Sequence, residues 1–174
     1  VYITLMAPDE SVRQYNATSK VQKDWQSRGQ GGEQMFAPWD ITRDSQGYLY
    51  VSDAFNHRVL KFQDTGKFIS AIGEMGIENG EFILPTGVAV DHQDNLYVVD
   101  TGNLRIQKFD AQGKFLYRLG GIKLPQTIVG NVDKIIKFIS DYSELGFPLD
   151  VAVDHHDNLY VTDLYKNNVK KFTA

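Results

Sequence analysis

Short runs of alternating apolar and polar residues recur along this chain in one fixed order. Each copy opens with a proline, passes through a β-branched run that ends in aspartate, and turns at residues rich in Asp, Asn and Gly. A Leu-Tyr-Val-x-Asp run and a run ending in Lys-Phe complete the pattern. A period of two residues between such turn signals predicts short β-strands joined by hairpins.

The spacing of the copies indicates an architecture. They begin at Pro38, Pro85 and Pro148, which lie 47 and then 63 residues apart. A repeat of about 40–50 residues that holds four short strands is typical of a β-propeller blade. The predicted fold class is therefore all-β, a β-propeller of four-stranded blades.

We interpret residues 1–174 as one β-propeller domain with four blades, two of them partial. The predicted strands number three, four, four and three, so no complementary pair closes a ring. We expect a segment of a larger propeller, completed by further blades; an open array and an assembly of several chains are the alternatives. The divisions are a partial blade at 1–30, a blade at 36–73, a blade at 82–120, an insert at 121–146 and a partial blade at 147–174.

The insert accounts for the longer distance of 63 residues between the last two copies, and its apolar residues follow a helical pattern. Apolar residues recur three or four positions apart from Val132 to Tyr142, with Asn131 as a helix cap and Gly146 as a stop. The pattern predicts a short amphipathic helix near 132–144. Its apolar face either packs on the blades or docks a partner.

Composition excludes several classes of protein. The formal net charge is −4 and the chain has no cysteine, so disulfides, thiol catalysis and thiolate metal sites are excluded. Mild acidity argues against non-specific nucleic-acid binding, which needs a basic surface. No targeting segment and no apolar run of about 18 residues is visible, so we predict a soluble protein without membrane insertion. The compartment is not indicated.

The sequence of the third blade resembles a known repeat. Pro85–Asp91 followed by Asn95–Phe109 is similar to the NHL repeat, and Asn56-His57-Arg58 is the tripeptide that names that family. The resemblance implies a propeller that most often has six blades. The last copy departs from the motif, because Lys166 and Asn168 replace the Asn and Arg of the tripeptide.

An acid ends the second strand of each copy, at Asp53, Asp100 and Asp163. A recurrent acid is compatible with a metal ring at the propeller axis. The stronger interpretation is structural, since an Asp at a strand end accepts hydrogen bonds from the following turn.

Three histidines are the candidate metal ligands. His92 and His155 occupy the same place in the first hairpin turn of their copies, and His156 follows directly. They would bind zinc or calcium only if their loops converged. Because they belong to separate blades, we predict no metal site and no cofactor.

The second turns vary between copies, and function is expected where copies differ. Phe55 and Tyr165 would project from the same face, with Lys166 adding a charge, and Trp39 would lie near the mouth of the channel. Exposed aromatic side chains on one face are typical of binding anchors. The alternative is that each packs against its own blade.

The leading functional hypothesis is a non-enzymatic scaffold or sensor that binds a protein or peptide through loops on one face. No catalytic constellation is evident from the spacing of residues. The NHL resemblance implies two alternatives: a metal-dependent enzyme of the lactonase or lyase kind, and an RNA-binding NHL domain. The acidic composition disfavours nucleic acid as a partner.

Overall fold

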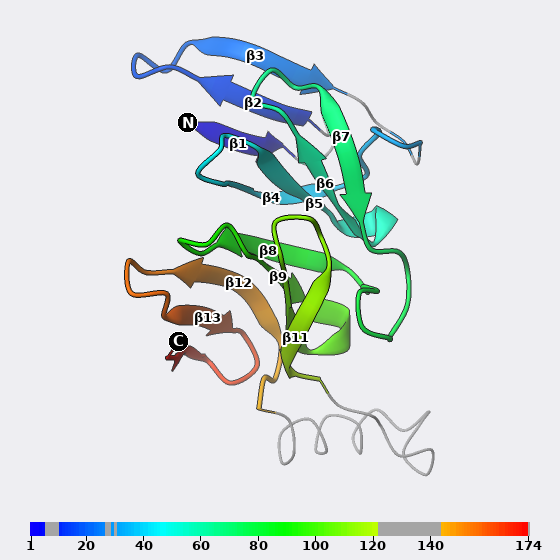
Figure 1. The fold of residues 1–174 in the computed structure, drawn as a ribbon, viewed down its shortest axis with the longest axis vertical. Coiled ribbons are helices and arrows are strands. Elements are labelled where there is room, and N and C mark those ends of the chain that lie inside the picture. The colour runs from blue at the N-terminus through cyan, green and yellow to red at the C-terminus, as the bar shows by residue number, and fades with distance from the viewer. Residues whose placement is uncertain (6–10, 27–28, 30, 122–143, 174) are drawn as a thin grey trace.

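The computed structural model describes residues 1–5, 11–26, 29, 31–121 and 144–173. Within them, fourteen antiparallel strands form four sheets, which confirms the all-β fold class (Figure 1). The first sheet holds β1 (Tyr2–Leu5), β2 (Ser11–Tyr15) and β3 (Val21–Gln26), and the second holds β4 (Pro38–Arg43), β5 (Leu49–Asp53), β6 (Arg58–Phe62) and β7 (Phe68–Ile72). The third holds β8 (Pro85–Val90), β9 (Leu96–Asp100), β10 (Arg105–Phe109) and β11 (Phe115–Gly120), and the fourth holds β12 (Pro148–Val153), β13 (Leu159–Asp163) and β14 (Asn168–Phe172).

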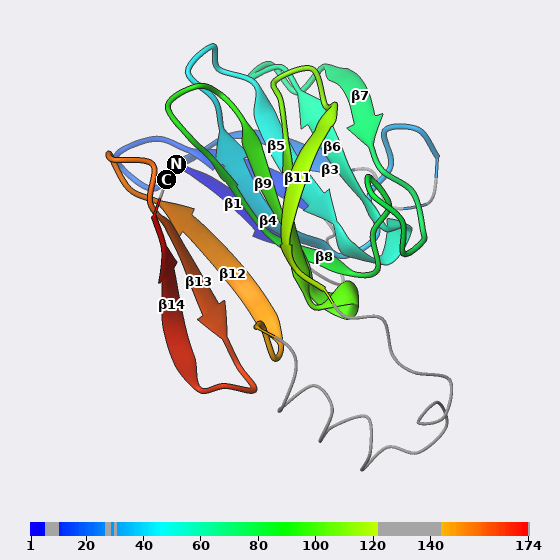
Figure 2. The same ribbon diagram turned by 60° about the horizontal axis from the view of Figure 1, so that its bottom comes forward.

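Every sheet follows the order of the chain, and neighbouring sheets lie side by side (Figure 2). The first strands of the last three sheets contact one another, because β4 meets β8 and β8 meets β12. These three are called the inner strands. In the first sheet β1 takes the place of a second strand, since Tyr2 packs toward the next sheet as Tyr50 does. The strand pattern of that sheet therefore begins one strand later than in the others.

The turn between the second and third strands has one recurring shape. A short 3₁₀ helix, η1 (Ala54–Asn56) or η2 (Thr101–Asn103), follows the strand and ends at a residue with positive φ. That residue is His57 in one copy and Leu104 in the next, each with φ of 55°. Residues other than glycine and asparagine seldom adopt this backbone conformation. The last copy places Asn167 there, with φ of 51°.

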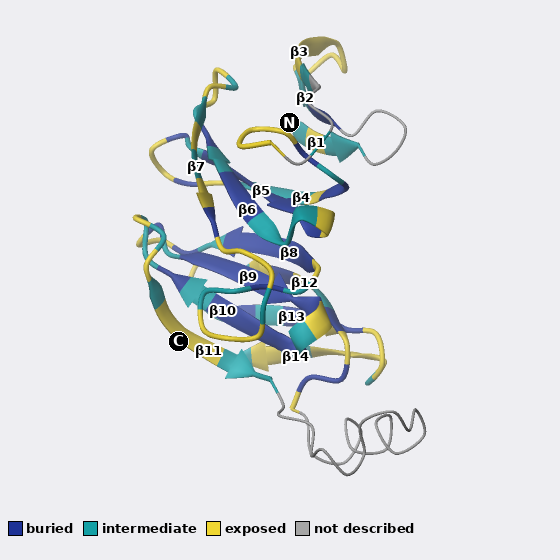
Figure 3. Cartoon of the chain, turned by 90° about the vertical axis from the view of Figure 1, so that its right-hand side faces the viewer, coloured by how far each residue is buried: buried dark blue, intermediate teal, exposed yellow. Residues whose placement is uncertain are grey.

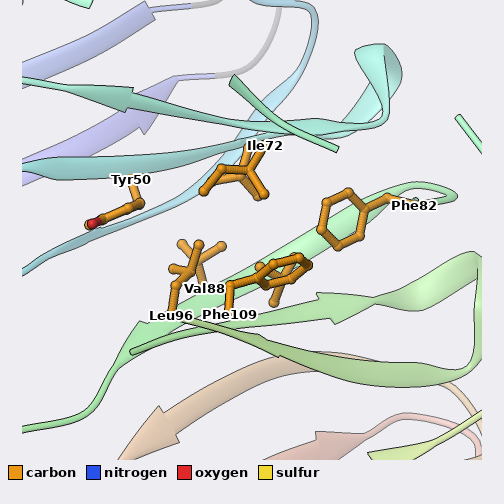
Figure 4. Close-up of a cluster of buried hydrophobic side chains, with 8 residues drawn as sticks. Tyr50, Ile72, Phe82, Val88, Leu96 and Phe109 are labelled. Atoms are coloured by element: carbon orange, nitrogen blue, oxygen red, sulfur yellow. The ribbon is translucent and has the colours of Figure 1, made fainter. Parts of the chain in front are cut away.

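The core lies between sheets and is assembled from equivalent positions of successive copies. Side chains of β5, β6 and β7 meet side chains of β8, β9 and β10 (Figure 4). Buried residues are concentrated in β5, β8, β9 and β10 (Figure 3). Each large apolar side chain buried in this way contributes roughly 1.5–3 kcal/mol relative to exposure. The cluster between the second and third sheets comprises Tyr50, Val59, Ile72, Phe82, Val88, Leu96, Val98 and Phe109.

The predicted helix near 132–144 lies, except for its last residue, outside the described residues. The segment from 144 to 147 is described and leads into β12 at Pro148. Leu145 is fully buried and joins the core cluster between the third and fourth sheets, at the position that Phe82 and Met35 fill in the preceding copies.

Candidate functional site

The strand-end aspartates hold the turns in place. Asp100 is fully buried, and its Oδ1 accepts a hydrogen bond of 2.7 Å from the backbone N–H of Ile83. Its Oδ2 accepts bonds from the side chains of Asn103 (2.8 Å) and Arg105 (2.6 Å). Burial raises the pKa of the Asp100 carboxyl despite these donors. Because its two oxygens are engaged by donors from the turn, from β10 and from the segment before β8, Asp100 has the geometry of a structural residue.

The last copy builds the same turn from backbone donors. Asp163 accepts hydrogen bonds from the N–H groups of Gly146 (2.7 Å), Phe147 (2.9 Å) and Lys166 (3.0 Å). Burial alone would raise the pKa of this carboxyl, but the three donors together with the positive charge of Lys170 hold the pKa below its ordinary value. Asn168, which stands where the earlier copies have arginine, is exposed at the start of β14. The altered tripeptide therefore changes the surface of the turn, while the hydrogen bonds to the strand-end aspartate are kept.

The predicted aromatic residues lie at one end of the sheets. Register places Pro38 opposite Asp53 and Pro148 opposite Asp163, so each inner strand begins where a second strand ends. We call this end the front face. The side chains of Trp39, Phe55 and Tyr165 lie there and are 43%, 49% and 46% exposed, and half-buried Lys166 is next to Tyr165.

Each turn aromatic is packed on one side and open on the other. The ring of Phe55 meets the ring of Phe36 edge-on, with centroids 5.1 Å apart. Tyr165 covers Gly146, where an added Cβ would lie 2.9 Å from the tyrosine ring. In the third sheet the turn position of Phe55 and Tyr165 is Gly102, and the larger residue, Ile83, lies at the position that it contacts. Packing of this kind fixes the rings in place and leaves about half of each available for contact.

The residues that directly precede the recurrent prolines add apolar side chains to the front face that were not predicted. Leu84 and Phe147 are 37% and 41% exposed, and each directly precedes the proline that opens its copy. Ala37 holds the same position in the earlier copy and is buried. The variation from alanine to leucine to phenylalanine at one repeat position was the signal available in the sequence.

Two carboxylates on inner strands were also missed. Asp40 Oδ1 accepts a bond of 2.8 Å from the N–H of Ile41, and its Oδ2 accepts one of 2.9 Å from Val88 in the next sheet. Burial raises the pKa of Asp40, and the nearby carboxylate of Asp150 adds to the rise. The signal was an acid two residues after the recurrent proline in two copies, with Gly87 between them.

The three candidate histidines, His92, His155 and His156, lie at the opposite end, the rear face, where the hairpin turns follow the inner strands. His92 Nδ1 lies 2.8 Å from an oxygen of Asp157 in the next sheet. The rings of His155 and His156 lie against each other with centroids 3.7 Å apart. Among the described residues, no three His, Cys, Asp or Glu side chains are grouped so that they could hold a metal ion.

A family model described as a 6-bladed beta-propeller (DUF5128) matches residues 40–134, more than half of the chain. The chain belongs to this family of six-bladed propellers. That assignment agrees with the expected propeller fold and with the expected number of six blades, while membership of the NHL family itself stays a prediction. No curated protein matches the sequence. In the described residues, no helix is long and apolar enough to cross a membrane.

Solved structures show the same fold at low identity. A structural genomics protein from Bacteroides thetaiotaomicron matches with a TM-score of 0.72 and 16% identity, over 99% of this chain and 44% of that one. Virginiamycin B lyase from Staphylococcus aureus matches with 0.61 and 14%, over 99% and 51%. A chain of a nidogen/laminin complex matches with 0.65 and 18%, over 99% and 54%. The chain thus spans about half the length of these structures.

Proposed function

We propose that this propeller is a non-enzymatic interaction module that binds a protein or peptide at the front face. One observation carries the proposal: five large apolar side chains, each between about a third and a half exposed, lie at the same end of the sheets. They are Trp39, Phe55, Leu84, Phe147 and Tyr165.

Physical chemistry favours contact through these side chains. Aromatic residues that are held by packing on one side lose little conformational freedom when a partner covers the other side. Phe55 and Tyr165 are held in this way by Phe36 and by the backbone of Gly146. The structural neighbour in a nidogen/laminin complex is a propeller within a protein assembly, which fits the same class of function.

Two candidates from other classes remain alternatives. A metal-dependent lyase is favoured by the carboxylates of Asp40 and Asp150 near one another and by the lyase among the neighbours. Elemental analysis after dialysis against calcium and zinc tests it, because a bound ion that is lost in Asp40→Asn would support an enzyme. An RNA-binding domain is less favoured, since the formal net charge is −4.

Selection of peptides tests the leading proposal. A random-peptide phage library would be panned on the chain, and selected peptides would be measured against the double variant Phe55→Ser/Tyr165→Ser. We expect affinity to fall at least about tenfold, because anchors of this kind carry most of an interface's binding energy.

The matched control is Ile69→Ser/Leu116→Ser, which removes two side chains that are 43% and 44% exposed on the outer strands β7 and β11. We expect its affinity to stay within about twofold of the wild type. Peptides that bind both double variants equally well, or no enriched peptide at all, would count against a binding role for the front face.

A further inference from the structure

The carboxylates of Asp40 and Asp150 lie against one short stretch of β8 from opposite sides. From β4, Asp40 Oδ2 accepts the N–H of Val88 at 2.9 Å. From β12, Asp150 Oδ1 lies 2.7 Å from the place that a Cβ on Gly87 would take. The two carboxylates are near enough for the charge of Asp150 to act on Asp40. Two negative charges from different sheets therefore meet close to the front-face ends of the inner strands.

This pair of acids has no basic partner in the part of the chain that the structure describes. Neither carboxylate forms an ion pair with Lys, Arg or His there. Asp150 is exposed, and its carboxylate accepts one hydrogen bond in those residues, from the N–H of Val151 to Oδ1 at 2.7 Å. Like charges that are held together repel each other, so a cation that contacts both would be favoured.

The loops that lead into the inner strands carry the same sign of charge. Their described residues, within 29–37, 73–84 and 144–147, include no lysine, arginine or histidine. The rear turns at 63–67 and 110–114 are different, because each holds an aspartate and a lysine. The acidic side chains of the front-face loops are Glu33, Glu74, Glu78, Glu81 and Glu144.

The arginines at this end of the sheets do not offset that charge. Arg105 is buried, and it donates to Asp100 and to loop carbonyls at Ile77, Glu78 and Glu81. Arg58 is held in the same way by Asp53 and the carbonyls of Gly31 and Gln34. In the described turns after the second strands, Lys166 is the exception to the acidic character of the face. The front face is thus apolar and acidic together, which is complementary to a basic partner.

An organic cation suits the acid pair better than a metal ion. Among the described residues no third His, Cys, Asp or Glu joins the pair. Calcium takes about six to eight oxygen ligands and zinc about four ligands, so two carboxylates provide too few. A guanidinium needs fewer acceptors, because its planar fork of N–H donors can reach two carboxylates on different strands.

We propose that the partner of the front face is a peptide segment with an arginine, whose guanidinium donates hydrogen bonds to both Asp40 and Asp150. This inference rests on the proposed function and adds the chemistry of the partner. The apolar residues beside the arginine would cover the exposed aromatic side chains of the face. The acidic loops speed the encounter with a basic segment, and the two charge-assisted contacts fix its register. A neutral or acidic segment would remove water from the carboxylates without replacing it.

Peptides selected on the chain give the first readout. Panning of a random library at about 50 mM salt should enrich arginine at one position relative to the unselected library, because weak screening preserves the charge contact. A selected peptide would be synthesised with arginine, with lysine and with citrulline, the uncharged analogue of arginine. By fluorescence polarisation we expect affinity to fall about tenfold with citrulline and about threefold with lysine.

Asp150→Asn is the matched change in the protein. Asparagine keeps an acceptor for the N–H of Val151 and removes only the charge, so the fold is preserved. We expect the arginine peptide to bind about five- to tenfold more weakly and the citrulline peptide to change less than about twofold. The control Asp64→Asn/Asp110→Asn removes two charges from the rear turns, and should leave the affinity for the arginine peptide within about twofold.

The outcomes separate this inference from the proposed function. Peptides that show no preference for arginine, yet lose affinity in Phe55→Ser/Tyr165→Ser, would overturn the arginine site and leave the front face as a binding surface. The absence of any enriched peptide would count against both. Equal losses of the arginine and citrulline peptides in Asp150→Asn would overturn the charge contact. Binding that requires added calcium or zinc would do so as well, because a metal ion would then occupy the acid pair.

Discussion

Two interfaces between neighbouring sheets can be compared in this chain. The upstream interface joins the second and third sheets, and the downstream interface joins the third and fourth. Both use the same apolar frame, since Tyr50 and Val88 in one correspond to Tyr97 and Val151 in the other. One polar link is shared, because the N–H of Ser45 donates to Asp94 upstream and the N–H of the equivalent His92 donates to Asp157 downstream. The side-chain links across the two interfaces differ.

The inner strands illustrate the difference. Upstream, the carboxylate of Asp40 spans the gap and accepts the N–H of Val88. Downstream, the equivalent residue is Gly87, and the Cα of Asp150 lies only 2.7 Å from the place that a Cβ would take. The Asp40 side chain therefore bridges β4 and β8 in the upstream interface, whereas the backbones of β8 and β12 approach each other directly in the downstream interface.

A hydroxyl network replaces the missing carboxylate downstream. Thr86 Oγ1 donates to the carbonyl of Leu149 (2.6 Å), and Thr101 Oγ1 donates to that of Pro148 (2.8 Å). The two hydroxyls are 2.6 Å apart. Upstream, the equivalents of these threonines are Trp39 and Ala54, which have no hydroxyl. The repeat therefore keeps the apolar frame constant, while the side-chain links between the inner strands differ from one interface to the next.

The largest effect is expected from Gly87→Ala, which should disrupt the downstream interface alone. The new methyl group would meet the backbone of β12, which cannot move without breaking the inner-strand packing. We expect a loss of about 1–3 kcal/mol in the free energy of unfolding, measured by urea titration with circular dichroism. Gly32→Ala is the control, because an added Cβ there meets nothing within 4 Å. An equal loss in both variants would show that the close approach of β8 and β12 is unimportant.

A smaller loss is expected from Thr101→Val, which keeps the shape and removes the hydroxyl. Thr101 is buried, so the carbonyl of Pro148 would lose its donor in a place that water does not reach. We expect a loss of about 1–2 kcal/mol in the same assay. Thr65→Val, at an exposed turn, should stay within about 0.5 kcal/mol of the wild type. If Thr101→Val is as stable as the control, the hydroxyl network does not hold this interface.

The comparison also shows what the sequence could predict. The strands, their turns and the structural role of Asp53 and Asp100 follow from residues close together in the chain. The links from Asp40 to Val88 and from His92 to Asp157 join residues 48 and 65 positions apart. Their partners depend on how far neighbouring sheets are rotated, and no local pattern encodes that. Sequence reasoning therefore treated the histidines as candidate ligands, and the structure places one of them in a contact between sheets.

The smallest effect concerns pH. At the rear face, Ser45 donates to Asp94 upstream through its N–H (2.8 Å) and its hydroxyl (2.7 Å). Downstream, the N–H of His92 donates to Asp157 in the same way (3.1 Å), and the imidazole Nδ1 (2.8 Å) takes the place of the hydroxyl. The hydrogen bond with Asp157 raises the pKa of His92 above its ordinary 6.5, and Asp91 and Asp154 nearby contribute to the rise. A raised histidine pKa means that the stabilisation is fully present below 6.5 and is lost as pH rises through the pKa of the folded state. The upstream link does not titrate in this range.

We therefore expect the downstream interface to weaken slightly between pH 6 and pH 8.5. Amide exchange, corrected for its intrinsic dependence on pH, should show lost protection near Asp157 and no change near Asp94. His92→Ser, which copies the upstream link, should abolish that dependence. In Asp157→Asn, whose positive φ of 60° suits asparagine, the NMR pKa of His92 should fall back toward 6.5. A His92 pKa that is unchanged in Asp157→Asn would show that the two interfaces do not differ in their response to pH.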